Sequence, residues 1–218
     1  MKLESVGILI GMRPLNERDS LATIFTADYG LMRGVMRAAQ VAKKNRPLIG
    51  QMGAVSWNAR LDSQLGTFHW EGSKNLAATL MMNPDGLALM NAAFELLSAL
   101  LPEREKFYEL YGTTIEMLPG LAMADARETY LRWEIALLRD AGYALDLTRC
   151  SGCGATEALN YMSPRTGRAV CDTCAAPYIG RLYELPISLD ITMKFLADAC
   201  AQQGAQMPNA RNFIMRKN

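Results

Sequence analysis

Short runs of alternating apolar and polar residues fill the first 75 residues of the chain. Alternation with a period of two is typical of strands that bury one face. The runs are separated by residues that favour turns, such as Tyr29-Gly30 and the segment that starts at Asp62. The pattern predicts five strands: Ser5–Met12, Ser20–Thr26, Leu31–Arg37, Ala54–Leu61 and Leu65–Glu71.

After Pro84 the apolar residues recur every three or four positions, a spacing that is typical of helices. Gly86–Leu101 is apolar on nearly every side, which predicts a central, buried helix. Three further helices are predicted, each followed or ended by a glycine. They span Arg104–Leu118, Asp125–Ala141 and Ser188 to about Gln203.

Four cysteines form the most specific motif in the chain. Two Cys-x-x-Cys pairs, Cys150 with Cys153 and Cys171 with Cys174, are separated by seventeen residues. This spacing is within the range of four-thiolate zinc sites, in which each pair forms a tight turn that directs both sulfurs at one ion. Four protein ligands leave no open position, so the sequence predicts one structural Zn²⁺.

The same cysteine motif has two alternatives to a zinc site, namely an iron site and two disulfides. The same four thiolates bind iron in some proteins, and spacing alone does not separate the two metals. Two disulfides are the other alternative, but the first residues do not predict a signal peptide, and a reducing cytoplasm favours metal. The fifth cysteine, Cys200, lies on an apolar helical face and is interpreted as a core residue.

These patterns together predict an α+β protein with two domains. Residues 1–80 are expected to form a small β-barrel, for which the five-stranded OB-fold is the common arrangement and an SH3-like barrel the alternative. Residues 81–218 are expected to form a helical domain, with the four-cysteine segment inserted as a zinc ribbon at 148–176.

The net charge of +1 hides an uneven distribution. Residues 1–80 carry ten Lys and Arg against six Asp and Glu, a net charge of +4, whereas residues 81–218 carry thirteen against sixteen, a net charge of −3. Every charge between Asp28 and Asp62 is positive, which indicates a surface for a polyanion such as nucleic acid. The predicted DNA contacts are Arg33, Arg37, Lys43, Lys44 and Arg46, with Arg13 and Arg60 as secondary candidates.

Four aromatic residues in the strand region have two interpretations. They either offer faces on which bases stack or fill the barrel interior. These residues are Tyr29, Trp57, Phe68 and Trp70.

The sequence lacks the common signatures of enzymes that bind nucleotides or use a nucleophilic serine. It contains no Gly-x4-Gly-Lys-Ser/Thr, no Gly-x-Gly-x-x-Gly and no Gly-x-Ser-x-Gly. His69 is the single histidine, which argues against histidine-based catalysis. A metal-dependent nuclease or hydrolase would need carboxylates or histidines around an open metal position, a pattern that the sequence does not show. The chain is therefore predicted not to be an enzyme.

Several segments carry a family resemblance when they are taken in order. An apolar strand at Gly7–Ile10 leads to the turn Arg13–Ser20 and then to Ile24-Phe25-Thr26. Trp57–Leu61 follows on a later strand, and Arg132–Leu138 precedes the two cysteine pairs. In this order and spacing the chain resembles the RecO family of bacterial recombination mediators, and its cysteines resemble those of the zinc-bearing members.

The resemblance implies a cytoplasmic, nucleoid-associated protein without a membrane segment. It implies that the chain binds single-stranded and double-stranded DNA, anneals complementary strands, and works with RecR and single-strand-binding protein to place RecA on gaps. The alternative is an RNA-binding protein with a barrel and a zinc ribbon, associated with the ribosome or with a polymerase.

The resemblance also implies a docking site for the acidic C-terminal tail of single-strand-binding protein on the helical domain. Such a tail requires an apolar recess with positive charge at its rim. Arg132 and Arg139 are seven residues apart and therefore share one helix face. The expected walls of the recess are Leu131, Leu138 and Tyr130. The alternative is that Arg132 pairs with Glu128 and that Arg139 faces water.

Overall fold

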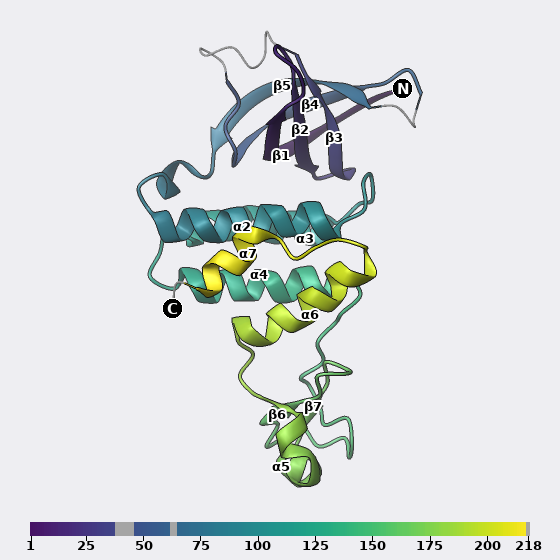
Figure 1. Ribbon diagram of the computed structural model, residues 1–218, viewed down its shortest axis with the longest axis vertical. Helices are drawn as coiled ribbons and strands as arrows, with labels where there is room; N and C mark the ends of the chain where they lie inside the picture. Colours follow the sequence, from purple (N-terminus) through teal and green to yellow (C-terminus); the bar gives the residue numbers. More distant parts are fainter. Residues whose placement is uncertain (38–45, 62–64, 217–218) are drawn as a thin grey trace. The chain divides into compact units, whose positions relative to one another are not determined.

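Five strands form a closed barrel in the computed structural model, which describes residues 1–37, 46–61 and 65–216. Around the barrel the strands follow the order β1-β2-β3-β5-β4 (Figure 1). Each strand overlaps one of the predicted alternating runs. Their bounds are β1 Lys2–Pro14, β2 Ser20–Thr26, β3 Gly30–Met36, β4 Gln51–Asn58 and β5 Gly66–Asn75.

The long strand β1 contributes to closure of the barrel because it pairs on both sides. Its residues Lys2–Ile8 pair with β4, and its residues Gly7–Pro14 pair with β2, both antiparallel. An irregularity in register between Leu9 and Gly11 marks a bulge, a feature that bends a strand and increases its twist. β3 and β5 pair in parallel over a short stretch at Gly34–Met36.

The barrel interior is filled by apolar side chains. They include three of the four aromatic residues that the sequence assigns either to base stacking or to the barrel core. Trp57 and Phe68 are 1% exposed and Trp70 is 8% exposed. Their faces therefore belong to the core and are not available to bases. The core cluster consists of Leu9, Ala22, Ile24, Met32, Met36, Val55, Trp57, Phe68 and Trp70.

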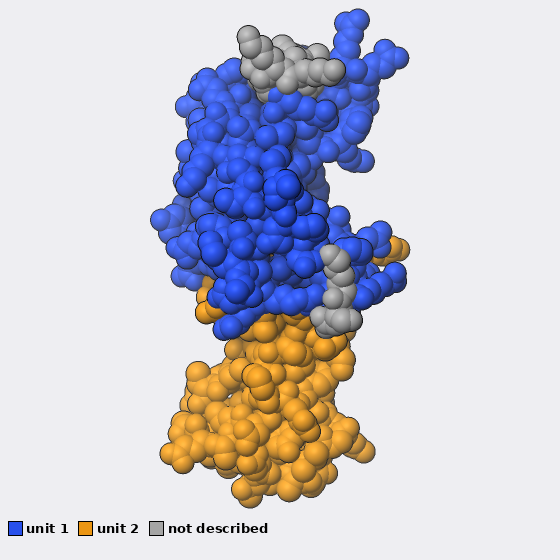
Figure 2. All heavy atoms as spheres, turned by 90° about the vertical axis from the view of Figure 1, so that its left-hand side faces the viewer, with its two compact units in different colours: residues 1–130, 208–218 blue, residues 131–207 orange. Residues whose placement is uncertain are grey.

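The contacts of the chain group it into two compact units, residues 1–130 with 208–218 and residues 131–207 (Figure 2). The first unit therefore combines the barrel with helices and with the last residues of the chain. The boundary between these units differs from the predicted domain boundary after residue 80. That residues 1–80 and 81–218 are separate folding domains therefore stays a prediction. No helix among the described ranges is both long and apolar enough to cross a membrane.

In the first unit, α2 (Pro84–Leu100) is the predicted buried helix. Asn83 caps it by accepting a hydrogen bond from the Gly86 N–H at 3.0 Å. A short 3-10 helix, η2 (Ala78–Leu80), precedes it. The last helix, α7 (Asn209–Met215), packs along α2 (Figure 1), and no predicted helix covers its residues.

The next helix, α3 (Tyr108–Gly120), begins four residues later than predicted. Arg104, the predicted first residue, has a positive φ of 61° that a helix does not allow. Its N–H donates to the Leu31 carbonyl oxygen at 2.8 Å, so this segment pairs with the start of strand β3 instead of starting a helix. Glu103 forms an isolated β-bridge with the same residue, Leu31.

Helix α4 (Ala126–Asp140) enters the second unit, which also contains α6 (Leu189–Gln202). Both helices end as predicted. Gly142 has a φ of +89°, and the Tyr143 N–H donates to the Leu138 carbonyl at 2.7 Å after α4. A buried hydrogen bond of 2.5 Å from Thr192 Oγ1 to Glu134 Oε2 joins the two helices.

The cysteine segment of the second unit forms a small three-stranded sheet. Its order is β7-β6-β8, with β6 Tyr161–Met162, β7 Ala169–Val170 and β8 Tyr183–Glu184. A tight turn joins β6 and β7, where Gly167 has a φ of +64° and its N–H donates to the Ser163 carbonyl at 2.9 Å. The one-turn helix α5 (Asp172–Ala175) and the 3-10 helix η3 (Ala176–Arg181) follow. Together, strands and helices confirm the α+β class.

Candidate metal centre and nucleic-acid interface

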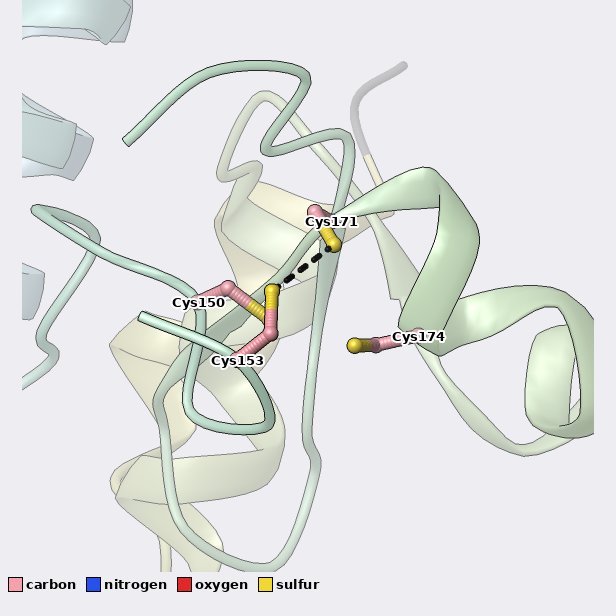
Figure 3. Close-up of side chains that lie close together, drawn as sticks. All are labelled: Cys150, Cys153, Cys171 and Cys174. Atoms are coloured by element: carbon pink, nitrogen blue, oxygen red, sulfur yellow. Dashed lines mark hydrogen bonds between the residues drawn. The ribbon is translucent and has the colours of Figure 1, made fainter. Parts of the chain in front are cut away.

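The four predicted metal ligands lie together. The sulfurs of Cys150, Cys153, Cys171 and Cys174 are all within 4.8 Å of one another. Cys171 directly precedes α5 and Cys174 lies within it, and the Cys174 sulfur points toward the sulfurs of the other pair (Figure 3). The hairpin of β6 and β7 brings the two pairs together across the seventeen intervening residues.

The first cysteine pair forms a tight knuckle of the expected kind. The Gly154 N–H donates to the Cys150 carbonyl at 2.9 Å, and Gly154 has a φ of +80°, which glycine adopts without strain. The Gly152 N–H donates to the Cys150 sulfur at 3.3 Å. A side chain at Gly152 would meet the Cys174 sulfur, since a Cβ there would lie 3.0 Å from it.

The spacing of the sulfurs fits a four-thiolate metal site. A tetrahedral zinc with Zn–S bonds of ~2.3 Å holds its sulfurs ~3.8 Å apart. The sulfurs of Cys153 and Cys171 are 3.6 Å apart, close to this value and far beyond the ~2.05 Å of a disulfide bond. All five cysteines are free. The four residues together could therefore hold one metal ion, and their chemistry is compatible with zinc.

The electrostatics of the cluster favour a cation. Hydrogen bonds from the backbone at Cys171 and then at Cys153 lower the pKa of Cys150 to about 6, because they stabilise its thiolate. Hydrogen bonding with the neighbouring sulfurs, that of Cys153 first, raises the pKa of Cys174 to about 12. One thiolate thus forms readily, whereas crowding by the other sulfurs opposes ionisation of Cys174, and a divalent ion removes that conflict.

Among the predicted DNA contacts, Arg33 is held by protein groups. One guanidinium nitrogen lies 2.7 Å from the Glu103 carboxylate, and the other donates to the Ser98 carbonyl at 3.1 Å. Its side chain is 37% exposed. A DNA phosphate would have to share or replace these partners. Arg33 therefore has a structural role, holding Glu103 and the end of α2, in addition to its predicted role as a DNA contact.

The other described DNA candidates are exposed on the barrel unit. Arg37 pairs with Asp19 at 3.0 Å, yet 64% of its side chain remains exposed. Arg13 lies near the end of β1, whereas Arg46 and Arg60 lie outside the strands. Lys43 and Lys44 lie outside the described residues. The DNA-binding role of all seven candidates remains a prediction.

The predicted recess on α4 is not formed as expected. Leu138 and Tyr130 are both fully buried, because they belong to the apolar face of the helix, and buried side chains cannot wall an open recess. Leu131 is partly buried, and Arg132 and Arg139 are exposed. Arg139 pairs with Asp140 at 3.0 Å rather than facing water alone. A partner role for these residues remains a prediction.

Comparison with known proteins identifies the chain by both of its halves. The family model described as Recombination protein O N terminal matches residues 1–72, and the one described as Recombination protein O C terminal matches residues 81–199. A protein of Cereibacter sphaeroides is 37% identical over 225 residues, covering 94% of this chain and 93% of the relative.

Two further relatives give the same result. A Ruegeria protein is 39% identical, covering 83% of this chain and 76% of its own length, and a Rickettsia bellii protein is 34% identical, covering 85% and 77%. All three relatives carry the name DNA repair protein RecO. Since the family models and the relatives agree along most of its length, the chain belongs to the RecO family of DNA repair proteins.

Proposed function

We propose that this chain binds single-stranded and double-stranded DNA through its barrel, anneals complementary strands and helps to load recombinase onto gaps coated with single-strand-binding protein. Its role as a recombination mediator in DNA repair follows from its family. The binding mode, the annealing and the loading step are the proposal. A DNA partner would place the protein at the nucleoid, in the bacterial cytoplasm.

One observation carries the proposal: cations cluster at the β1–β2 end of a closed five-stranded barrel. Arg13 precedes the turn between these strands, Arg18 lies within it, and Arg37 is tied to it through Asp19. In the OB-fold, which we propose for this barrel, the loop between the first two strands is one of the nucleic-acid contacts. Cations there neutralise phosphates without reading sequence, as a protein that acts on any gap requires.

We propose that the four cysteines hold one structural zinc in a ribbon. The ion would supply charge neutralisation and a rigid cross-link between the two knuckles. Because all four donors are protein sulfurs, no position is left for water or substrate, and the site suits folding rather than hydrolysis. This donor set supports a non-enzymatic role for the chain.

RecR and single-strand-binding protein are the proposed protein partners. For the acidic tail of single-strand-binding protein, Arg132 and Arg139 remain candidate contacts because both are exposed. A labelled tail peptide should bind wild-type protein and lose affinity for Arg132→Ala at unchanged thermal stability. Equal affinity of both proteins would remove Arg132 from the tail site.

Titration with labelled DNA tests the proposed function. Wild-type protein should bind single-stranded and duplex DNA with an affinity that falls steeply with salt, and should speed the annealing of complementary strands without nucleotide. An RNA strand of the same sequence is the control. Preference for RNA, or absence of binding to both DNA forms at low salt, would contradict the proposal.

A further inference from the structure

The β1–β2 turn, residues Leu15–Asp19, carries an exposed apolar side chain. Leu15 directly follows the last residue of β1 and is 46% exposed. The next two residues, Asn16 and Glu17, are polar and exposed. An isolated exposed leucine is common on protein surfaces. What distinguishes this one is the rigidity and charge of the turn that carries it.

Hydrogen bonds within the β1–β2 turn fix its shape. The N–H groups of Leu15 and Asn16 donate to the Asp19 carbonyl at 3.0 and 3.3 Å. The Asn16 side-chain oxygen accepts from the N–H groups of Arg18 and Asp19 at 2.8 and 2.7 Å. The turn is thus ordered by folding, and a ligand that contacts it does not have to order it.

Strand pairing at the base of the turn also fixes its position. Pro14 pairs with Ser20, so the β1–β2 ladder extends to the base of the turn. Ser20 also pairs with Met36 of β3, which extends the support to a third strand. The next residue of the chain, Arg37, reaches back to the turn through its ion pair with Asp19.

Charged residues lie on both sides of the exposed leucine in the sequence. Arg13 and Arg18 flank Leu15 in sequence and are exposed, as is the guanidinium side chain of Arg37. The pairing of Arg37 with Asp19 offsets one of the two acids of the turn, and the exposed Glu17 is the other. The arginines attract phosphate, while Leu15 offers a surface that phosphate does not use.

We propose that Leu15 packs against unstacked bases of single-stranded DNA while Arg13 and Arg18 contact the flanking phosphates. This inference rests on the proposed function, and it predicts that Leu15 adds affinity for single strands but not for duplex. Bases of a single strand are free to receive an apolar side chain. In a duplex the same insertion must first unstack a base step, which opposes binding.

The two kinds of contact have different experimental signatures. Removing the leucine should lower affinity for single strands and leave the salt dependence unchanged, because no counterion is involved. Removing one arginine should reduce the salt slope by about 0.7 for single strands and weaken binding to both DNA forms. The ratio of single-strand to duplex affinity therefore separates Leu15 from its neighbours.

The test is a titration of labelled oligothymidylate and of a blunt duplex of equal length against wild type, Leu15→Ala, Arg18→Ala and Val6→Ala. Val6 is the matched control, because it is a 51% exposed aliphatic residue in the first half of β1, away from the turn. Leu15→Ala should lose about threefold to tenfold in single-strand affinity, as expected for the apolar area of one side chain. Its duplex affinity should stay within twofold.

Three outcomes decide the matter. An unchanged affinity ratio in Leu15→Ala, with wild type binding normally, overturns the inference and leaves the proposed function intact. An equal loss in Val6→Ala also overturns it, since the effect would then not belong to the turn. Absence of DNA binding by wild type contradicts the proposed function itself. Thermal unfolding of each variant is the control that checks whether the fold is retained.

Discussion

The guanidinium of Arg33 on β3 lies 2.7 Å from the carboxylate of Glu103, in the segment between α2 and α3. Its second nitrogen donates to the carbonyl of Ser98, in the last turn of α2, where positive charge also complements the helix dipole. A residue predicted from its charge to contact DNA thus joins the barrel to the end of a helix within the same unit.

Arg33→Ala should therefore lower stability more than it lowers DNA affinity. The expected loss is about 1 kcal/mol, because the pair is more than one-third exposed and solvent weakens it. Thermal unfolding of Arg33→Ala, Glu103→Ala and the double variant measures the coupling, and a DNA titration gives the salt slope. A reduced slope with unchanged unfolding would instead identify Arg33 as a phosphate contact.

Gly30 should tolerate no side chain. It has a φ of +60°, and a Cβ there would lie 1.8 Å from the Glu105 carbonyl oxygen. Gly30→Ala should cost about 3 kcal/mol or more, because strain and a backbone clash act together. Gly112 in α3 is the matched control, since a Cβ there meets nothing within 4 Å. Gly112→Ala should stabilise by about 0.5–1 kcal/mol in the same urea titration.

Tyr111→Phe should retain or increase stability at neutral pH. The Tyr111 hydroxyl is buried without a hydrogen-bond partner among the described residues, and its ring packs edge-on against Phe25 with centroids 5.6 Å apart. The substitution keeps the ring contact and removes an unsatisfied group, a change worth up to about 1 kcal/mol.

The same substitution should change the alkaline limb of the stability curve. Burial, with a smaller effect of Asp28, raises the pKa of Tyr111 above its ordinary value of 10.0. The unfolded chain therefore ionises first, and stability is lost as pH rises through about 10. Urea unfolding between pH 8 and pH 11 should show a smaller loss in Tyr111→Phe. Identical curves would show that Tyr111 ionises normally.

Removal of one cysteine ligand should remove the metal. Wild-type protein purified without added metal should contain about one zinc per chain, and Cys171→Ser should contain much less and unfold at lower temperature. Cys200→Ser is the matched control, because Cys200 is buried in α6 and is not part of the sulfur cluster. Iron in place of zinc, or a fully folded wild type without metal, would contradict the zinc assignment.

Neutralising Lys43 and Lys44 together should flatten the salt dependence of DNA binding by up to about 2 units in the logarithmic slope. The measurement is a salt titration of Lys43→Gln with Lys44→Gln against wild type. An unchanged slope would place the phosphate contacts elsewhere, for which Arg165 and Arg168 of the ribbon are exposed candidates.

Local pattern determined what could be predicted from the sequence. The alternating runs located all five strands, and cysteine spacing located the sulfur cluster, because both depend on neighbours in the chain. The role of Arg33 depends on Glu103, seventy residues away, which charge counting does not reveal. Burial of Leu138 and Tyr130 depends on which helix face meets the core.

Short elements without strong periodicity were missed for a related reason. The seven residues of α7 are too few to show a helical repeat, and their stability comes from packing along α2. Leu15 and Arg18 were visible as part of a polar turn. Their exposure on a turn fixed by its own hydrogen bonds is a property of the folded barrel.

The packing of α7 along α2 also sets an order of events during synthesis. Residues 131–207 form a unit of their own, and the ribosome must complete them before the chain returns to the first unit. At typical bacterial rates these residues take about 4 to 15 s to translate. During that interval α2 has no partner from α7, and the Glu95 carboxylate lacks the Ala210 N–H from which it accepts a hydrogen bond of 3.1 Å in the folded protein. The first unit therefore cannot be completed until the second has been translated.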